Sequence, residues 1–317
     1  MYYFIVNKHG GSGNARKTWH EVRRLMKEKG IEYKAYATSY AGHGSELAAK
    51  VCALPDDDIR LVVVGGDGTI NEVLNGITDF DKIKLGVIPT GSGNDFAREL
   101  EIPRDTREAL DLVLSSIGEK KIDLGRVWAD NGSDRIFGIS SGIGLDAIVC
   151  KKVQNSVQKK LLNKLHLGGL SYILTTIKTL FVMKKYDVNV RVYKENKPDV
   201  PDIIENYAVD YCDLIFLAGM NFKCEGGGVP MTPGAKPDDG LLSVCAVNGV
   251  PKWKAFFLLT KLMKGKHKGI RGFNLYDAEK LELRAAVPMV LHADGEYMGD
   301  VKLITMEVLH SKLRVLI

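Results

Sequence analysis

The segment LVVVGGDGTIN, residues 61–71, joins an apolar run to a glycine turn and then to the start of a helix. The β-branched run predicts a buried strand, and three glycines around Asp67 end it abruptly. Thr69 then opens a segment with apolar residues at helical spacing. This combination favours phosphate binding, because glycines admit a close backbone approach and a helix N-terminus presents N–H donors. A carboxylate there is costly beside phosphate unless it holds Mg²⁺ or accepts a proton. A tight turn without a ligand is the alternative for the tetrapeptide alone.

Two further segments repeat the design. Residues 85–98, LGVIPTGSGNDFAR, lead from an apolar strand through a Gly/Ser turn to a helix start that Asn94 or Asp95 would cap. At the N-terminus, a strand over residues 2–6 enters the glycine loop NKHGGSGN, residues 7–14, and a basic amphipathic helix follows from about residue 15 to residue 29. Three glycine turns at strand ends predict one crevice at the carboxyl edge of a parallel sheet.

The organisation of the 317-residue chain changes near residue 122. Before it, strands alternate with helices, which predicts parallel βαβ units. After it, strand-like segments dominate with about three helical interruptions, which predicts an antiparallel β-rich domain. We expect these strands at residues 122–128, 135–141, 186–195, 204–218, 241–247, 280–284, 288–292 and 302–308.

Composition favours an ordinary cytosolic protein. The hydrophobic content is 45%, and the five cysteines form no C-x-x-C pair, so neither a zinc site nor a disulfide framework is expected. The sequence starts with a strand rather than a signal peptide. No uncharged apolar run approaches the roughly 20 residues that span a bilayer. The histidines form no pattern suited to a metal, so packed or solvated roles are expected for them.

Two stretches combine basic and large apolar residues without any acidic ones. Residues 151–185 contain eight lysines, and residues 252–271 contain seven basic residues, in a chain of net charge +5. Helices of this kind lie on anionic membrane surfaces, although a core helix with a solvated lysine face has the same pattern. Lysines within residues 159–164 are expected to contribute to membrane binding. No nucleic-acid-binding module is recognised, so nucleic acid is not an expected partner.

Several motifs, in order along the chain, resemble the diacylglycerol kinase/sphingosine kinase superfamily of lipid kinases, in particular its soluble bacterial branch. They are GGDGT (65–69), PTGSGNDFAR (89–98), GIGLDA (142–147), GGG (226–228), PGAKPDDGL (233–241) and DGE (294–296). The first motif also occurs in NAD kinases and phosphofructokinases, so the asparagine-aspartate loop and the late DGE motif carry most of the weight. Lys8 stands where the family often has proline, which leaves the detail of the first loop open.

The resemblance implies two domains. An NAD kinase-like α/β domain with a parallel sheet would comprise residues 1–122 and about 303–317. An antiparallel β-sandwich over residues 123–302 would bind the lipid, with the ATP cleft between the domains. A β-rich domain of this family often pairs, so a homodimer is a further expectation.

The resemblance also implies ATP and Mg²⁺ as cofactors and assigns residues to them. Those expected to contact ATP are Asn7, Lys8, His9, Gly10, Gly11, Thr38, Gly65, Gly66, Asp67, Gly68, Thr69, Ile70, Asn71, Ser92 and Asn94. A structural Mg²⁺ would be held by the Asp239 carboxylate and the backbone carbonyls of Lys236 and Leu241. An ordinary Asp-Gly turn is the alternative for this motif.

Two carboxylates match the family positions for proton acceptance. The bacterial branch favours Glu296 as the base, with Asp67 organising Mg²⁺ and phosphates, whereas sphingosine kinases give the base role to the counterpart of Asp67. Both assignments stay open from sequence. The DGE motif also fits a hairpin turn between strands, and the two roles can coexist. Asp146 and Asp95 are further candidates for contact with the substrate, although Asp146 is also placed to cap a helix.

The expected activity is transfer of the γ-phosphoryl group of ATP to a lipid hydroxyl at the cytoplasmic face of the membrane. Diacylglycerol, giving phosphatidic acid for phospholipid biosynthesis, is the leading substrate. A sphingoid base, monoacylglycerol or phosphatidylglycerol stays open. An NAD kinase is the next hypothesis, followed by a nucleotide-binding regulator without turnover. The NDFAR motif and the basic apolar stretches argue against the NAD kinase, and the presence of Asp67, Glu296 and Asp239 argues against the regulator.

Overall fold

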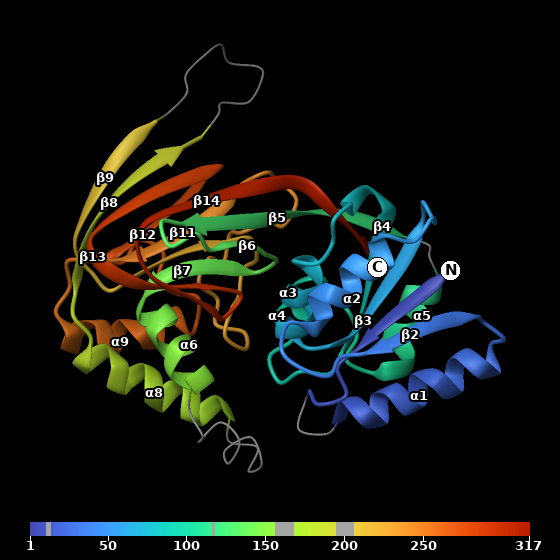
Figure 1. Cartoon of the computed structure of the whole chain (residues 1–317). Coiled ribbons are helices and arrows are strands. Elements are labelled where there is room, and N and C mark those ends of the chain that lie inside the picture. Colours follow the sequence, from blue (N-terminus) through green and yellow to red (C-terminus); the bar gives the residue numbers. More distant parts are fainter. Residues whose placement is uncertain (11–13, 116–117, 156–167, 195–205) are drawn as a thin grey trace. The chain divides into compact units, whose positions relative to one another are not determined.

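The computed structural model describes residues 1–10, 14–115, 118–155, 168–194 and 206–317 (Figure 1). The chain divides into two compact units. The first comprises Met1–Asp123 and Ser311–Ile317, and the second comprises Leu124–His310. The chain therefore returns to the first unit later than the residue near 303 that the sequence suggests. Among the described residues, no helix has both the length and the apolar character that crossing a membrane requires.

Parallel strands form the sheet of the first unit. In spatial order they are β4 (Ile83–Pro89), β3 (Ile59–Gly65), β1 (Tyr2–Val6) and β2 (Tyr33–Ala37). β1 is a continuous apolar run, and β3 is one from Leu61 to Gly65, because both are inner strands that are buried on both faces. β2 lies at the edge and is largely exposed. The end of β14 (Glu296–Leu316) adds a parallel pairing on the far side of β4.

Helices follow these strands, as the alternating pattern predicts. They are α1 (Asn14–Glu28), α2 (His43–Cys52), α3 (Asp67–Leu74), α4 (Asp95–Glu99) and α5 (Thr106–Ser115), with a 3₁₀ turn, η2 (Phe80–Lys82). α1 buries an apolar stripe at helical spacing, and Trp19 from this stripe packs 5.6 Å from the Phe4 ring of β1. The segment just after α3 approaches α2 so closely that a Cβ at Gly76 would lie 2.0 Å from the carbonyl oxygen of Ser45.

The second unit consists mainly of antiparallel strands with three described helices. The strands are the second half of β5 (Glu119–Ala129), β6 (Asp134–Phe137), β7 (Ser140–Gly144), β8 (Tyr186–Tyr193), β9 (Tyr207–Leu214), β10 (Phe216–Met220), β11 (Leu242–Val247), β12 (Phe273–Ala278), β13 (Lys280–Ala293) and most of β14. The main order is β12-β11-β10-β7-β13-β14. The helices are α6 (Leu145–Asn155), α8 (Gly168–Val182) and α9 (Lys252–Leu262), and α8 contacts both of the others.

Two apolar clusters make the core of the second unit. One lies among strands and includes Val190, Leu217 and Leu283. The other lies where the helices meet strands β10 and β11 and includes Phe216 and Leu258. Together with the parallel first unit, this arrangement confirms the predicted fold class of an α/β domain and an antiparallel β-sandwich-like domain.

Strand boundaries differ from the sequence-based expectation in several places. The segment expected at 302–308 is part of the 21-residue strand β14, Glu296–Leu316, and β5 begins at Glu119 instead of residue 122. Segment 135–141 is two strands, because the chain turns between β6 and β7. The backbone N–H groups of this turn donate to the Asp294 carboxylate. Segment 204–218 is also two strands, and Asp213 near the break has a φ of +57°. Segments 280–284 and 288–292 form one strand, β13, with a register shift between Arg284 and Met289. β12 is a strand that the sequence pattern did not reveal.

Candidate functional site

Four loops of the first unit begin at one edge of its sheet. The first residue after a strand still donates a backbone hydrogen bond to the carboxyl end of a neighbouring strand. These bonds run from Asn7 N to Val64 O, from Thr38 N to Val6 O and from Thr90 N to Gly65 O, at 2.9–3.0 Å. The glycine turns after β1, β3 and β4 therefore share one edge, as the sequence predicts, and the loop after β2 begins at the same edge.

The two glycine turns after β3 and β4 are in direct backbone contact. A Cβ at Gly66 would lie 2.9 Å from Gly91 Cα, and a Cβ at Gly91 would lie 2.8 Å from Gly66 Cα. Any side chain at either position would separate the turns. Glycine is thus required here by the approach of two loops and not only by turn geometry.

Gly91→Ala is expected to weaken nucleotide binding about tenfold or more, because its methyl group forces the two turns apart. The added methyl carbon would also clash with Asn94 Oδ1, at 2.7 Å. Titration calorimetry with a non-hydrolysable ATP analogue measures the effect. Gly234→Ala is the matched control, since nothing lies within 4 Å of a Cβ there. Equal nucleotide affinities for the two variants would contradict the requirement for this contact.

The first glycine loop is tied to the second. Asn7 Nδ2 donates to Thr69 Oγ1 at 2.9 Å, and the backbone N–H of His9 donates to Asn7 Oδ1 at 3.0 Å. Lys8 is half-buried and His9 is exposed. Of the other residues expected near ATP, four are buried: Thr38, Thr69, Ile70 and Asn71. Gly10 and Gly68 are half-buried, and Ser92 is exposed. Gly11 lies outside the described residues.

Asp67 lies where this edge meets the start of α4. Its carboxylate accepts hydrogen bonds from the backbone N–H groups of Asp95, at 3.2 Å, and Phe96, at 3.1 Å. Asn94 is the N-cap residue of this helix, one of the two residues expected there, but it makes no side-chain cap hydrogen bond. Asn94 has a φ of +53°, its amide bonds to both backbone groups of Gly91, and the Asp95 carboxylate pairs with Arg98. Asp67 supplies the cap instead.

The DGE motif forms the hairpin turn between β13 and β14, as the sequence predicts. Asp294 and Gly295 both have positive φ, 48° and 80°, which a type I′ turn requires. The Asp294 carboxylate accepts three backbone N–H bonds of 2.8–3.0 Å from residues 138–140, so it anchors the turn to the β6–β7 connection. Glu296 opens β14 and pairs with Ala293 across the turn, with a partly exposed side chain.

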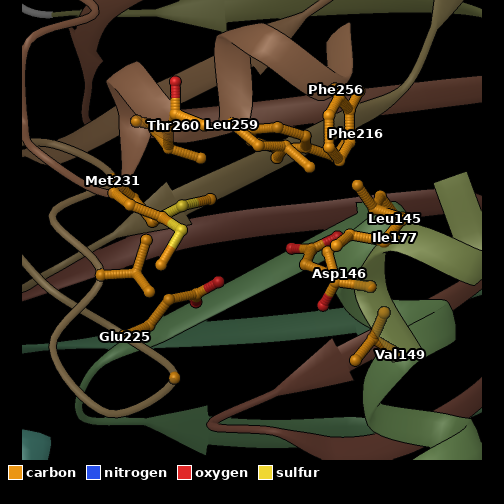
Figure 2. Close-up of a pocket in the computed structure, with 15 residues that line it drawn as sticks. Leu145, Asp146, Val149, Ile177, Phe216, Glu225, Met231, Phe256, Leu259 and Thr260 are labelled. Carbon is orange, nitrogen blue, oxygen red and sulfur yellow. The ribbon is translucent and has the colours of Figure 1, made fainter. Parts of the chain in front are cut away.

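An apolar pocket of about 220 Å³ lies in the same unit (Figure 2). Its walls come from helices α6, α8 and α9, from β10 and from the loop before β11. The lining residues are Leu145, Asp146, Val149, Thr176, Ile177, Phe216, Glu225, Gly226, Val229, Met231, Phe256, Leu259, Thr260, Leu262 and Met263. In Figure 2 the α9 side chains Phe256, Leu259 and Thr260 lie across the pocket from Asp146 and Glu225. The pocket therefore combines apolar walls with two carboxylates, as a site for an amphipathic ligand would.

The two carboxylates meet His292 from β13. One ligand-type atom from each of the three side chains lies within 4.8 Å of the others, and His292 Nε2 is 3.1 Å from Asp146 Oδ2. Burial lowers the pKa of His292, but the hydrogen bond to Asp146 and the negative charges of Asp146, Glu225 and Asp294 outweigh burial and raise it. Sequence reasoning missed both His292 and Glu225. The glycine run 226–228 was a signal for Glu225, and no local signal marked His292.

The expected metal loop lies before β11. Asp239 is exposed, and its Oδ1 accepts a hydrogen bond of 3.1 Å from the Leu241 N–H across Gly240, which has a φ of +75°. The Asp239 carboxylate and the loop carbonyls are the hard oxygen donors that Mg²⁺ prefers. Asp67, a carboxylate beside the glycine turns, has the same donor chemistry.

Comparison with known proteins covers both units. Residues 1–127 match the family model described as the diacylglycerol kinase catalytic domain, and residues 139–317 match the YegS C-terminal NAD kinase beta sandwich-like domain. A diacylglycerol kinase of Bacillus subtilis is 30% identical over 297 residues, which are 93% of this chain and 89% of that protein. A diacylglycerol kinase of Staphylococcus epidermidis is 30% identical over 93% of this chain and 85% of its own length.

A solved structure shows the same fold. It is the crystal structure of a diacylglycerol kinase from Bacillus anthracis, with a TM-score of 0.72 and 21% sequence identity over 99% of this chain and 96% of that one. The two family models describe a protein with a kinase catalytic domain followed by a sandwich-like domain. The chain belongs to the diacylglycerol kinase family of lipid kinases. It is thus an enzyme that phosphorylates a lipid with ATP as the phosphoryl donor.

Proposed function

We propose that this kinase transfers the γ-phosphoryl group of ATP to the free hydroxyl of diacylglycerol, forming phosphatidic acid. The observation that carries the proposal is the pocket of the second unit, whose apolar walls accompany two carboxylates in the unit that also holds the DGE turn. Apolar walls suit acyl chains, and carboxylates accept hydrogen bonds from a hydroxyl. The names of the Bacillus subtilis and Staphylococcus epidermidis relatives support diacylglycerol over other neutral lipids.

In this proposal the glycine turns of the first unit hold the phosphates of ATP. The backbone around Gly65 and Gly66 and the start of α3 would donate N–H groups to the phosphate oxygens, helped by the loop after Asn7 and by Ser92. The Gly66–Gly91 contact leaves both turns without side chains between them, so a phosphate can approach their backbones closely.

Asp67 is proposed to hold the catalytic Mg²⁺. The ion would neutralise the phosphate oxygens during transfer. The two N–H bonds from the start of α4 fix the orientation of the Asp67 carboxylate. A carboxylate held in place by the backbone suits a fixed cation site. Asp239, with the carbonyls of Lys236 and Leu241, is proposed to hold a second, structural Mg²⁺.

Glu296 is the proposed proton acceptor for the lipid hydroxyl. It is the first residue of β14, and the turn that precedes it is fixed by the backbone bonds of Asp294. A base held on a rigid hairpin keeps its position relative to a bound substrate, which is what general base catalysis requires. Asp146 and Asp95 stay candidates for contact with the substrate, and Asp146 lines the pocket.

A panel of acceptors tests the substrate. Purified protein with ATP and Mg²⁺ would be given diacylglycerol, monoacylglycerol, sphingosine or phosphatidylglycerol in the same detergent micelles, and kcat/KM would be compared. We expect the highest value for diacylglycerol. A kcat/KM at least about tenfold higher for another lipid would leave the assignment as a lipid kinase intact, but it would replace diacylglycerol as the proposed substrate.

Helices α8 and α9 are proposed to dock the enzyme on anionic membranes. Trp253 and Phe257 of α9 are 63% and 60% exposed, and Val182 of α8 is 71% exposed. The same two helices carry exposed lysines a few residues from these side chains in the sequence. They are Lys178 of α8 and Lys254 and Lys261 of α9. Basic and apolar groups together suit an interfacial surface. The lysines of residues 159–164 lie outside the described residues. The same holds for Leu161, Leu162, Leu165 and Leu167, which are large apolar residues of the first basic stretch, 151–185.

Changing Trp253 and Phe257 together to alanine is expected to weaken binding to vesicles containing phosphatidylglycerol about tenfold or more, because each ring contributes buried apolar area. Vesicle co-sedimentation measures the partition coefficient. The control changes Val287 and Leu303 to alanine, since these residues of β13 and β14 are 48% and 45% exposed. If both double variants bind as the wild type does, the docking surface is not on α9.

A further inference from the structure

We propose that His292 is a positioning residue that couples the lipid pocket to the DGE turn. The inference rests on the proposed function, in which the pocket binds the lipid and Glu296 accepts the proton. It assigns a role to a histidine that touches neither ATP nor the reacting hydroxyl.

The imidazole ring of His292 bridges two parts of the second unit. Its Nε2 is 3.1 Å from Asp146 Oδ2, and its Nδ1 accepts a hydrogen bond of 3.2 Å from the Gly295 N–H. Since a backbone N–H is always a donor, Nδ1 must be the unprotonated nitrogen in this arrangement. The ring proton therefore sits on Nε2 and is donated to Asp146. With His292 only 1% exposed, water does not compete for either bond.

On the pocket side, His292 fixes the direction of the Asp146 carboxylate. Asp146 is 9% exposed and lines the pocket. Its second oxygen, Oδ1, is buried and accepts no hydrogen bond from the described residues. A buried carboxylate oxygen without a donor is unfavourable, and a ligand hydroxyl would supply one. The neighbouring Glu225 carboxylate already accepts a hydrogen bond from the Ser140 hydroxyl. Asp146 Oδ1 is therefore the better acceptor for a ligand hydroxyl.

On the turn side, His292 holds the backbone that precedes Glu296. Asp294 is anchored by the amides of residues 138–140, whereas the Gly295 N–H is directed at the ring. A shift of Asp146 toward a bound hydroxyl would move the ring and with it the Gly295 peptide. Occupancy of the pocket and the position of Glu296 are therefore linked through one side chain.

Two substitutions separate the two bonds. In His292→Asn the side-chain carbonyl can take the place of Nδ1 and keep the Gly295 bond, but nothing reaches Asp146. In His292→Gln the amide nitrogen can take the place of Nε2 and keep the Asp146 bond, but the acceptor for Gly295 is lost. We expect the asparagine variant to raise KM for diacylglycerol about tenfold with a smaller change in kcat, and the glutamine variant to lower kcat about tenfold with a smaller change in KM.

His20→Gln is the control, because His20 is an exposed histidine of α1, in the first unit, and does not line the pocket. A second measurement does not need turnover: hydrogen exchange of the peptide covering the DGE turn, with and without a short-chain diacylglycerol. Added lipid should slow exchange of the turn in the wild type. It should leave exchange unchanged in both variants, because each lacks one of the two bonds that link the pocket to the turn. Equal changes of kcat and KM in both variants, with lipid still slowing exchange in His292→Asn, would overturn the coupling. A wild type that phosphorylates no lipid but shows the exchange effect would instead overturn the proposed function alone.

Discussion

Asp67→Asn should lower turnover at least about a hundredfold, because the variant loses the negative charge proposed to hold Mg²⁺ beside the phosphates. The fold should survive. The asparagine carbonyl can still accept one of the two N–H bonds that the carboxylate takes from Asp95 and Phe96, and loss of the other costs about 1 kcal/mol. Steady-state kinetics and thermal unfolding measure the two effects. The variant should also need a higher Mg²⁺ concentration for half-maximal activity.

Asp57→Asn is the matched control for this substitution. The Asp57 side chain is 92% exposed and lies in the same unit, so the same change of charge there should leave turnover unchanged. If Asp67→Asn retained turnover within about twofold of the wild type, with the same Mg²⁺ requirement, the proposed role of Asp67 would be wrong.

Glu296→Gln is expected to lower kcat by about 10²–10⁴, the usual contribution of a general base. Glutamine keeps the size of the side chain, and the turn itself depends on Asp294 and Gly295, so thermal stability should change little. Unlike Asp67→Asn, this variant should keep the Mg²⁺ dependence of the wild type. The two substitutions therefore distinguish a proton acceptor from a cation ligand, a choice that stays open from sequence.

Glu307→Gln serves as the control for Glu296, because it makes the same change further along β14. Glu307 lies 3.9 Å from Arg126, a surface pair whose loss has little effect on stability. A Glu296→Gln enzyme with normal kcat, alongside an inactive Asp67→Asn enzyme, would transfer the base role to Asp67.

The fold could be predicted from local patterns because each pattern has a local cause. The apolar run 61–64 requires a strand buried on both faces, and the glycines after it require an abrupt turn, whatever the rest of the chain does. The position of the DGE turn follows in the same way from two strands and an Asp-Gly pair. Local patterns of this kind are enough to place three glycine loops at one sheet edge.

The parts that could not be predicted depend on contacts between distant residues. The sequence makes Asn94 and Asp95 the natural caps of α4, but the loop after β3 brings Asp67 to the same amides, and its charged carboxylate takes them. His292 is equally invisible from sequence, because its partner Asp146 lies on a different element and is 146 residues away. The contacts on which the proposed role of His292 rests come from tertiary placement alone.

The most direct test of the central claim is phosphoryl transfer from γ-labelled ATP to diacylglycerol in mixed micelles, with NAD in a parallel tube and with a chelator added as a metal-free control. We expect label in phosphatidic acid, no label in NADP, and loss of transfer when Mg²⁺ is removed. Label in NADP, or ATP binding without transfer to any acceptor, would contradict the assignment as a diacylglycerol kinase.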